Sequence, residues 1–168
     1  MKSDQSFLVA FWSPCSFRTE DYCLDYFSAF LKKFGDVQCI DCKNSQEPRI
    51  LHLLRHMDLV VVGLRQNYYE LGRFVTSNVH RFVNCVYLII DYFALEEISF
   101  GQIRKQFRIP RERLVCIPYN ERYHAARRAG RGRNYLLRGG EKENYEAGAA
   151  FWQELEKTGL AILHALDL

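Results

Sequence analysis

The sequence predicts an α/β fold with three layers, in which helices cover both faces of a doubly wound, mostly parallel sheet of about five strands. Three observations support this prediction. Short runs rich in β-branched and aromatic residues recur along the 168 residues, these runs are largely apolar throughout, and amphipathic segments separate them. Strands of a parallel sheet that is covered on both faces have this composition, and right-handed crossovers connect them.

The strand-like runs are 7–12, 36–41, 58–64, 86–91 and 113–118. Helical spacing of apolar residues predicts helices over 20–34, 47–56, 68–79, 102–107, 121–129 and 144–168, with Gly130 ending the fifth. Residues 138–144 have the composition of a linker. We therefore expect one domain spanning 1–168, with 144–168 as its C-terminal helix.

Composition excludes several classes of protein. The apolar fraction of 48% and the charged fraction of 26% are those of an ordinary globular protein. No apolar run approaches the roughly 18 residues of a membrane span, and the acid Asp4 argues against a secretory signal. Most of the six cysteines lie within apolar runs, as they do in proteins of a reducing compartment. These features predict a cytoplasmic protein without a membrane partner.

The segment 36–67 contains a candidate functional carboxylate. Asp41 ends a predicted strand, and the carboxyl ends of parallel strands form the edge where such folds bind ligands. In a nucleotide enzyme this carboxylate would hold a magnesium ion or its water. The simpler interpretation is an aspartate that caps a turn.

Four segments carry a resemblance to a known family. They are Ile40-Asp41-Cys42, Asp58-Leu59-Val60-Val61-Val62 followed by Gln66, Leu88-Ile89-Ile90-Asp91-Tyr92, and Ile117-Pro118-Tyr119-Asn120 followed by Ala126 and Gly130. In order and spacing, the region 36–138 resembles the ParA/MinD family of deviant P-loop ATPases, particularly its CpaE/TadZ-like members. The resemblance implies a nucleotide site at the carboxyl edge of the sheet.

The chain departs from that family where the nucleotide would bind. The family has a glycine-rich loop with two lysines after its first strand, but this chain has Ser-Pro-Cys-Ser-Phe-Arg at 13–18. Asp91 stands where the resemblance implies a base-reading asparagine, and an ionised carboxylate only accepts hydrogen bonds. We therefore expect a vestigial site without catalytic residues, cofactor or metal, made of Ser13, Arg18, Asp41, Asp91 and Pro118.

The segment 122–138 is the strongest candidate for a binding surface. Six arginines occur in it without an acid, and Tyr123 and Tyr135 lie among them. Such a segment can neutralise phosphates, stack on bases or bind an acidic protein, although a solvated helix end has the same composition. Four glycines at 130, 132, 139 and 140 predict a mobile end. The predicted partner-binding residues are Arg122, Arg127, Arg128, Arg131, Arg133 and Arg138.

Two pairs of residues have weaker functional interpretations. Cys39 and Cys42 have the spacing of a redox pair, but residues three apart on a strand point to opposite faces. His52 and His56 are four apart on a predicted helix and resemble half of a metal site, although a surface pair explains them more simply.

The sequence thus predicts a non-catalytic ParA/MinD-like interaction protein, a pseudo-ATPase acting as an adaptor in partitioning, polar localisation or pilus machinery. Its expected partner is a protein, such as a second copy or an ATPase relative, and nucleic acid is a further candidate through 122–138. The alternative is a nucleotide-binding protein or ATPase with an unconventional phosphate site formed by Arg18 and the arginines between 127 and 133.

Overall fold

A computed structural model describes residues 6–14, 23–76, 84–96, 98–138 and 146–168. Within them, five parallel strands form one sheet in the order β2-β1-β3-β4-β5. This is one of the two common doubly wound orders, the flavodoxin-like one. The strands are β1 (Ser6–Trp12), β2 (Asp36–Lys43), β3 (Leu59–Arg65), β4 (Cys85–Tyr92) and β5 (Leu114–Pro118).

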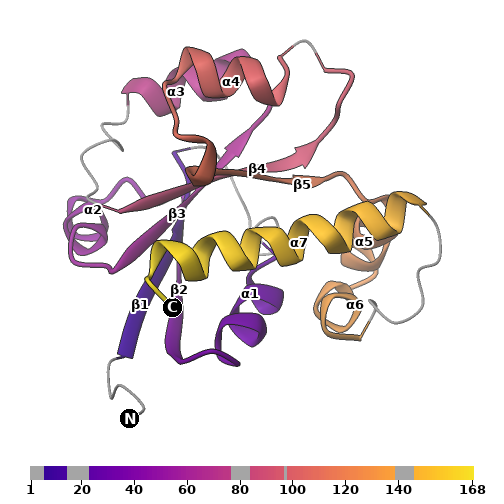
Figure 1. The fold of residues 1–168 in the computed structure, drawn as a ribbon, viewed down its shortest axis with the longest axis horizontal. Coiled ribbons are helices and arrows are strands. Elements are labelled where there is room, and N and C mark those ends of the chain that lie inside the picture. The colour runs from indigo at the N-terminus through magenta and orange to yellow at the C-terminus, as the bar shows by residue number, and fades with distance from the viewer. Residues whose placement is uncertain (1–5, 15–22, 77–83, 97, 139–145) are drawn as a thin grey trace.

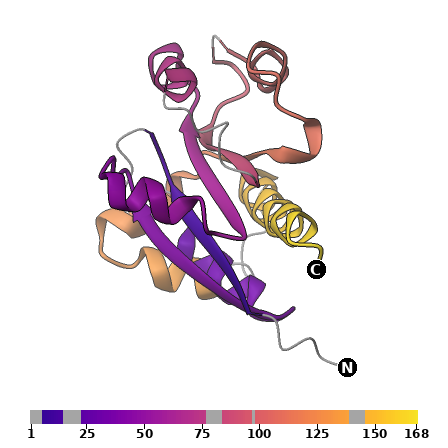
Figure 2. The same cartoon turned by 90° about the vertical axis from the view of Figure 1, so that its left-hand side faces the viewer.

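Helices cover both faces of the sheet (Figure 1). One face carries α1 (Leu24–Leu31), α5 (Glu121–Arg128), α6 (Gly132–Arg138) and the long α7 (Glu146–Ala165). The other carries α2 (Pro48–Leu54), α3 (Tyr68–Thr76) and α4 (Phe100–Gln106). Figure 2 shows α3 and α4 on one side of the strands and α7 on the other. A short 3-10 turn, η3 (Arg111–Arg113), leads into β5.

The sheet separates two apolar cores. Along β1 the side chains alternate, so Val9 and Phe11 pack with α1 and α7, whereas Ala10 and Trp12 pack with α2 and α3. In the centre of the sheet, the residues of β3 from Leu59 to Leu64 are all buried. A strand covered on both faces needs this uninterrupted apolar sequence.

The predicted three-layer α/β fold is confirmed, and the described strands and helices lie close to their predicted ranges. The prediction of a mobile end after Gly130 was wrong over part of its length, because residues 132–138 form α6. Leu136 is buried against the core beside α1 and α7 and anchors this helix. Gly139, Gly140 and most of the predicted linker at 138–144 lie outside the described residues.

A polar cluster joins several elements at the amino end of β4. The side-chain amide of Asn84 donates to the carbonyl oxygens of Asp58 and Ala165, at 2.9 and 2.8 Å. Its side-chain oxygen accepts from the guanidinium of Arg113. One side chain therefore connects the start of β3, the end of α7 and the turn before β5.

Among the described helices, none combines the length and the apolar character that crossing a bilayer requires.

Candidate functional site

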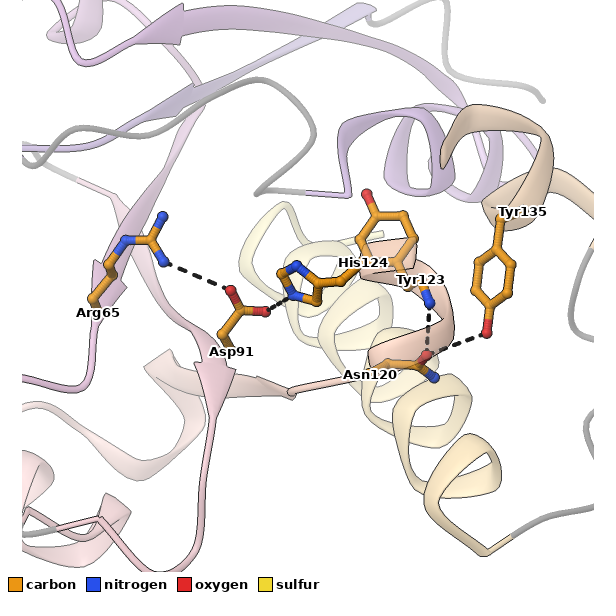
Figure 3. Close-up of polar contacts among 6 residues, drawn as sticks. All are labelled: Arg65, Asp91, Asn120, Tyr123, His124 and Tyr135. Atoms are coloured by element: carbon orange, nitrogen blue, oxygen red, sulfur yellow. Dashed lines mark hydrogen bonds and ion pairs between the residues drawn. The ribbon is translucent and has the colours of Figure 1, made fainter. Parts of the chain in front are cut away.

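Three side chains from different elements meet at the carboxyl edge of the sheet (Figure 3). Arg65 ends β3, Asp91 lies near the end of β4, and His124 lies in α5. The Nε2 atom of His124 is 2.7 Å from Oδ1 of Asp91, and Nη1 of Arg65 is 3.6 Å from Oδ2. An ionised carboxylate only accepts hydrogen bonds, so the imidazole N–H is the donor. Asp91 is thus held between two basic groups, with 22% of its side chain exposed.

The backbone at Asp91 is unusual. Its φ of 54° lies in the left-handed region, where aspartate and asparagine are tolerated better than most other residues. The register between β4 and β5 shifts at this point, between Ile90 and Tyr92. The irregularity leaves Asp91 between the neighbouring strand and α5 at the end of the sheet.

An aromatic stack adjoins this carboxylate. The ring of Tyr119 stacks on His124 with centroids 4.6 Å apart, and Phe93 stacks on Tyr119 at 4.9 Å. Phe93 is 44% exposed and Tyr119 is 36% exposed. The side-chain amide of Gln66 fixes this loop, because it donates to the Phe93 carbonyl and accepts from the Phe93 N–H.

Asn120 connects α5 with α6 beside the same site. Its side-chain oxygen accepts the backbone N–H of Tyr123 at 2.8 Å, which is the cap of α5. The same oxygen accepts the Tyr135 hydroxyl at 3.4 Å (Figure 3). A buried asparagine therefore sets the position of both basic helices.

The predicted vestigial residues do not converge on one point. Ser13 follows β1, Asp41 lies in β2 and Pro118 ends β5. The strand order places β1 and β3 between Asp41 and Asp91, a separation of about 14 Å at the usual strand spacing. Asp41 pairs with Phe11 near the end of β1 and so lies beside Ser13, whereas Pro118 pairs with Tyr92 beside Asp91, so the described residues of the predicted site form two groups. Arg18 lies outside the described residues.

Ser13 and Asp41 hydrogen-bond to the protein itself. Ser13 is fully buried, its hydroxyl donates to the Gly63 carbonyl at 2.8 Å, and its N–H donates to the Lys43 carbonyl at 2.9 Å. Asp41 accepts the Lys43 N–H at 2.9 Å, as an aspartate that caps a turn does. These contacts support the structural interpretation of both residues.

The predicted arginines separate into two groups. Arg122, Arg131 and Arg138 line a hollow of about 550 Å³ between α5 and α6, together with Asn134 and Tyr135. The others lie outside this hollow. Arg127 lies 5.6 Å from the centroid of the Tyr123 ring, and Nε of Arg133 is 3.6 Å from Oδ1 of Asp25 in α1. Arg128 is exposed. We call these six arginines the basic surface.

The two tyrosines of this segment differ in burial. Tyr123 is 3% exposed and packs on Phe151. Tyr135 stacks on Trp152 at 5.7 Å. Tyr123 is therefore too buried to stack on a base, whereas Tyr135 is partly buried and also lines the hollow.

The described cysteines are free thiols. Cys39 packs on the α1/α7 side of the sheet and Cys42 on the opposite side, as their spacing predicts. Burial raises the pKa of Cys39 to about 11 and that of Cys85 to about 12. Thiols held in the protonated form are poor nucleophiles. In the part of the chain that the structure describes, no three His, Cys, Asp or Glu side chains group to hold a metal.

Arg65 and His124 were not predicted from the sequence as site residues. Arg65 pairs with Ile90 across β3 and β4, which brings it beside Asp91, and this proximity depends on the strand order. A signal was present for Arg65, since it follows the buried run of β3 at the functional edge. The sequence carried no such signal for His124, because its contact with Asp91 requires α5 to turn back over β4.

No protein-family model matches the chain, and a comparison with curated proteins finds no match.

Proposed function

We propose that this chain is a non-catalytic, ParA/MinD-like interaction protein that binds an acidic protein partner through the basic surface. The observation that carries the proposal is the hollow between α5 and α6, around which Arg122, Arg131 and Arg138 lie. A guanidinium group can form a bidentate ion pair with a carboxylate. Several arginines around one hollow therefore favour an acidic side chain or the C-terminal end of a helix as the bound group. An adaptor in cytoplasmic partitioning, polar localisation or pilus machinery would use such a surface.

The carboxyl edge of the sheet supports a function without catalysis. Ser13 hydrogen-bonds to neighbouring strands, and Asp91 faces Arg65 and His124. The segment 13–18 also contains neither glycine nor lysine, the residues whose amides and ammonium groups hold phosphates. These features leave the triphosphate chemistry of an ATPase without its usual protein groups.

An acidic protein is favoured over nucleic acid as the partner. Binding of single strands relies on exposed aromatic rings, and of the two tyrosines among these arginines Tyr123 is buried, while Tyr135 lines the hollow with its ring stacked on Trp152. The ion pair of Arg133 with Asp25 of α1 supports this choice, because a carboxylate already lies against one of these arginines. The surface is also preorganised, since Asn120 holds α5 against α6.

Binding of a labelled poly-glutamate peptide at low salt tests the partner class. We expect saturable binding that weakens as salt rises, because the charges at such a surface are screened. Replacing Arg122, Arg131 and Arg138 by serine should abolish it. The matched control replaces the exposed Arg55, Lys105 and Arg111, which removes the same charge from other places. Equal loss in both variants, or tighter binding of a single-stranded oligonucleotide, would contradict the proposal.

The alternative function, an unconventional nucleotide site, is tested with ATP and magnesium. A nucleotide at 100 times its dissociation constant would stabilise the fold by about 2.7 kcal/mol, which a thermal-shift assay detects. We expect no such shift and no phosphate release above background. Turnover that disappears in Asp41→Ala would establish an active ATPase and remove the proposal.

A further inference from the structure

Two histidines outside the carboxyl edge face each other on the surface. His52 lies in α2, and His56 lies just beyond its end, where its N–H donates to the Leu53 carbonyl at 2.9 Å. Their Nε2 atoms are 3.3 Å apart, and their ring centroids are 4.8 Å apart at an interplanar angle of 67°. Both side chains are exposed. The pair therefore presents two adjacent ring nitrogens to solvent.

This separation matches one edge of a tetrahedral zinc site. Nitrogens bound at about 2.0–2.1 Å to one tetrahedral Zn²⁺ lie about 3.3–3.4 Å apart. The hydrogen bond that now joins the two rings needs a proton on one Nε2 atom, and a metal ion would take the place of that proton. Because both rings are exposed, they can turn towards a shared ion without disturbing the core.

We propose that His52 and His56 bind one divalent transition-metal ion of the zinc class through their Nε2 atoms. Imidazole nitrogen suits Zn²⁺, Co²⁺, Ni²⁺ and Cu²⁺, whereas Mg²⁺ and Ca²⁺ require oxygen ligands. No third side chain of the described residues joins the pair. Two coordination positions are therefore left for water or for a group of another molecule, which makes this an open site.

The proposal is independent of the basic surface. The pair lies on α2, which packs on the face of the sheet opposite to α5 and α6. Loss of metal binding would thus leave the proposed partner binding intact, and failure of the peptide assay would leave this inference intact. The two proposals are tested with different variants and different ligands, so the failure of one can be distinguished from the failure of the other.

Competition for Zn²⁺ with a chromophoric chelator tests the site on the full chain without an affinity tag. We expect the parent protein to take up one equivalent of Zn²⁺ and no Mg²⁺. His52→Ala and His56→Ala should each weaken binding by about 100-fold, because the second imidazole then no longer adds an intramolecular contact. His164→Ala, which removes an exposed histidine from the end of α7, is the matched control and should keep the parent affinity.

The visible spectrum of the Co²⁺ form tests the geometry. Imidazole coordination shifts the visible absorption bands of aqueous Co²⁺, and this shift should be present in the parent and in His164→Ala but absent from His52→Ala and His56→Ala. Circular dichroism would show that all variants keep the fold. Parent protein that does not compete for Zn²⁺, or His52→Ala and His56→Ala variants that keep the parent affinity, would overturn the proposal.

Discussion

The two ends of β4 carry polar clusters of different kinds. At the amino end, the side-chain amide of Asn84 donates to two backbone carbonyls, and Arg113 donates to its oxygen. At the carboxyl end, Asp91 meets the side chains of Arg65 and His124. The first cluster binds mainly main chain, whereas the second joins ionisable side chains to one another.

The difference shows where this fold can change without losing its shape. A side chain that bonds backbone carbonyls of β3 and α7 fixes how those elements pack, and its loss leaves those carbonyls without a donor. A cluster of partly exposed side chains at the ends of two strands and the start of a helix contributes less to packing. Functional groups in open α/β sheets collect at the carboxyl end. We therefore expect substitutions at the amino end of β4, around Asn84, to destabilise the fold more than substitutions at its carboxyl end, around Asp91.

Asn84→Ala should have the largest effect on stability. It removes two hydrogen bonds to carbonyls and the acceptor of Arg113, at a cost of about 2–3 kcal/mol in the free energy of unfolding. Urea denaturation followed by circular dichroism measures this cost. Asn67→Ala is the matched control at the other end of the sheet, since Asn67 accepts one N–H, that of Glu70. Its cost should be about 1 kcal/mol. Equal costs would contradict the comparison.

Substitutions of Asp91 should have smaller and graded effects. Asp91→Ala loses the contacts to His124 and Arg65 and also places alanine at a φ of 54°, so we expect a loss of about 2 kcal/mol. Asp91→Asn tolerates this φ and should lose about 1 kcal/mol. Thermal and urea unfolding of both variants show which one loses more of the free energy of unfolding. Identical losses would show that the backbone conformation contributes nothing.

Most of the fold was predictable because its signals are local. Runs such as that of β3 are apolar throughout, and a covered parallel strand needs such a run wherever it lies in the sheet. The helix α6 was missed because its sequence is basic and begins at a glycine. That glycine has a packing reason, since a Cβ at Gly132 would lie 2.8 Å from Cγ of Arg127. The reason is visible only once α5 and α6 are placed together.

The candidate site was predictable only in part, because its contacts link distant segments. Asp91 was singled out through the family resemblance, at the end of a predicted strand, and this needed no tertiary information. Its partners come from β3 and α5, so finding them requires the strand order and the path of the chain after β5. The burial of Tyr123 was missed for the same reason, since sequence alone does not tell an inward ring from an outward one.

High pH should weaken the amino end through its buried thiol. Burial is the main cause that raises the pKa of Cys85 from 9.0 to about 12. The thiol therefore deprotonates more readily in the unfolded chain, so its contribution to stability is complete below pH 9 and is lost as the pH rises towards 12. At a pH one unit above the unfolded pKa, the loss is about 1.4 kcal/mol. Urea denaturation between pH 8 and about pH 10.5 should show a shallower decline for Cys85→Ala than for the parent. Parallel declines would contradict this.

The smallest effects should be the pairwise couplings at the carboxyl end. Two double-mutant cycles separate them, each combining Asp91→Gly, which suits the positive φ, with a change in one partner. His124→Phe keeps a ring against Tyr119 but removes the donor at 2.7 Å, and we expect a coupling of about 1 kcal/mol. Arg65→Met keeps the apolar stem but removes a charge that lies 3.6 Å from the carboxylate and is 32% exposed. Solvent screens that pair, so its coupling should stay below about 0.5 kcal/mol. A larger coupling for Arg65 than for His124 would mean that charge, and not the short hydrogen bond, holds Asp91 in place.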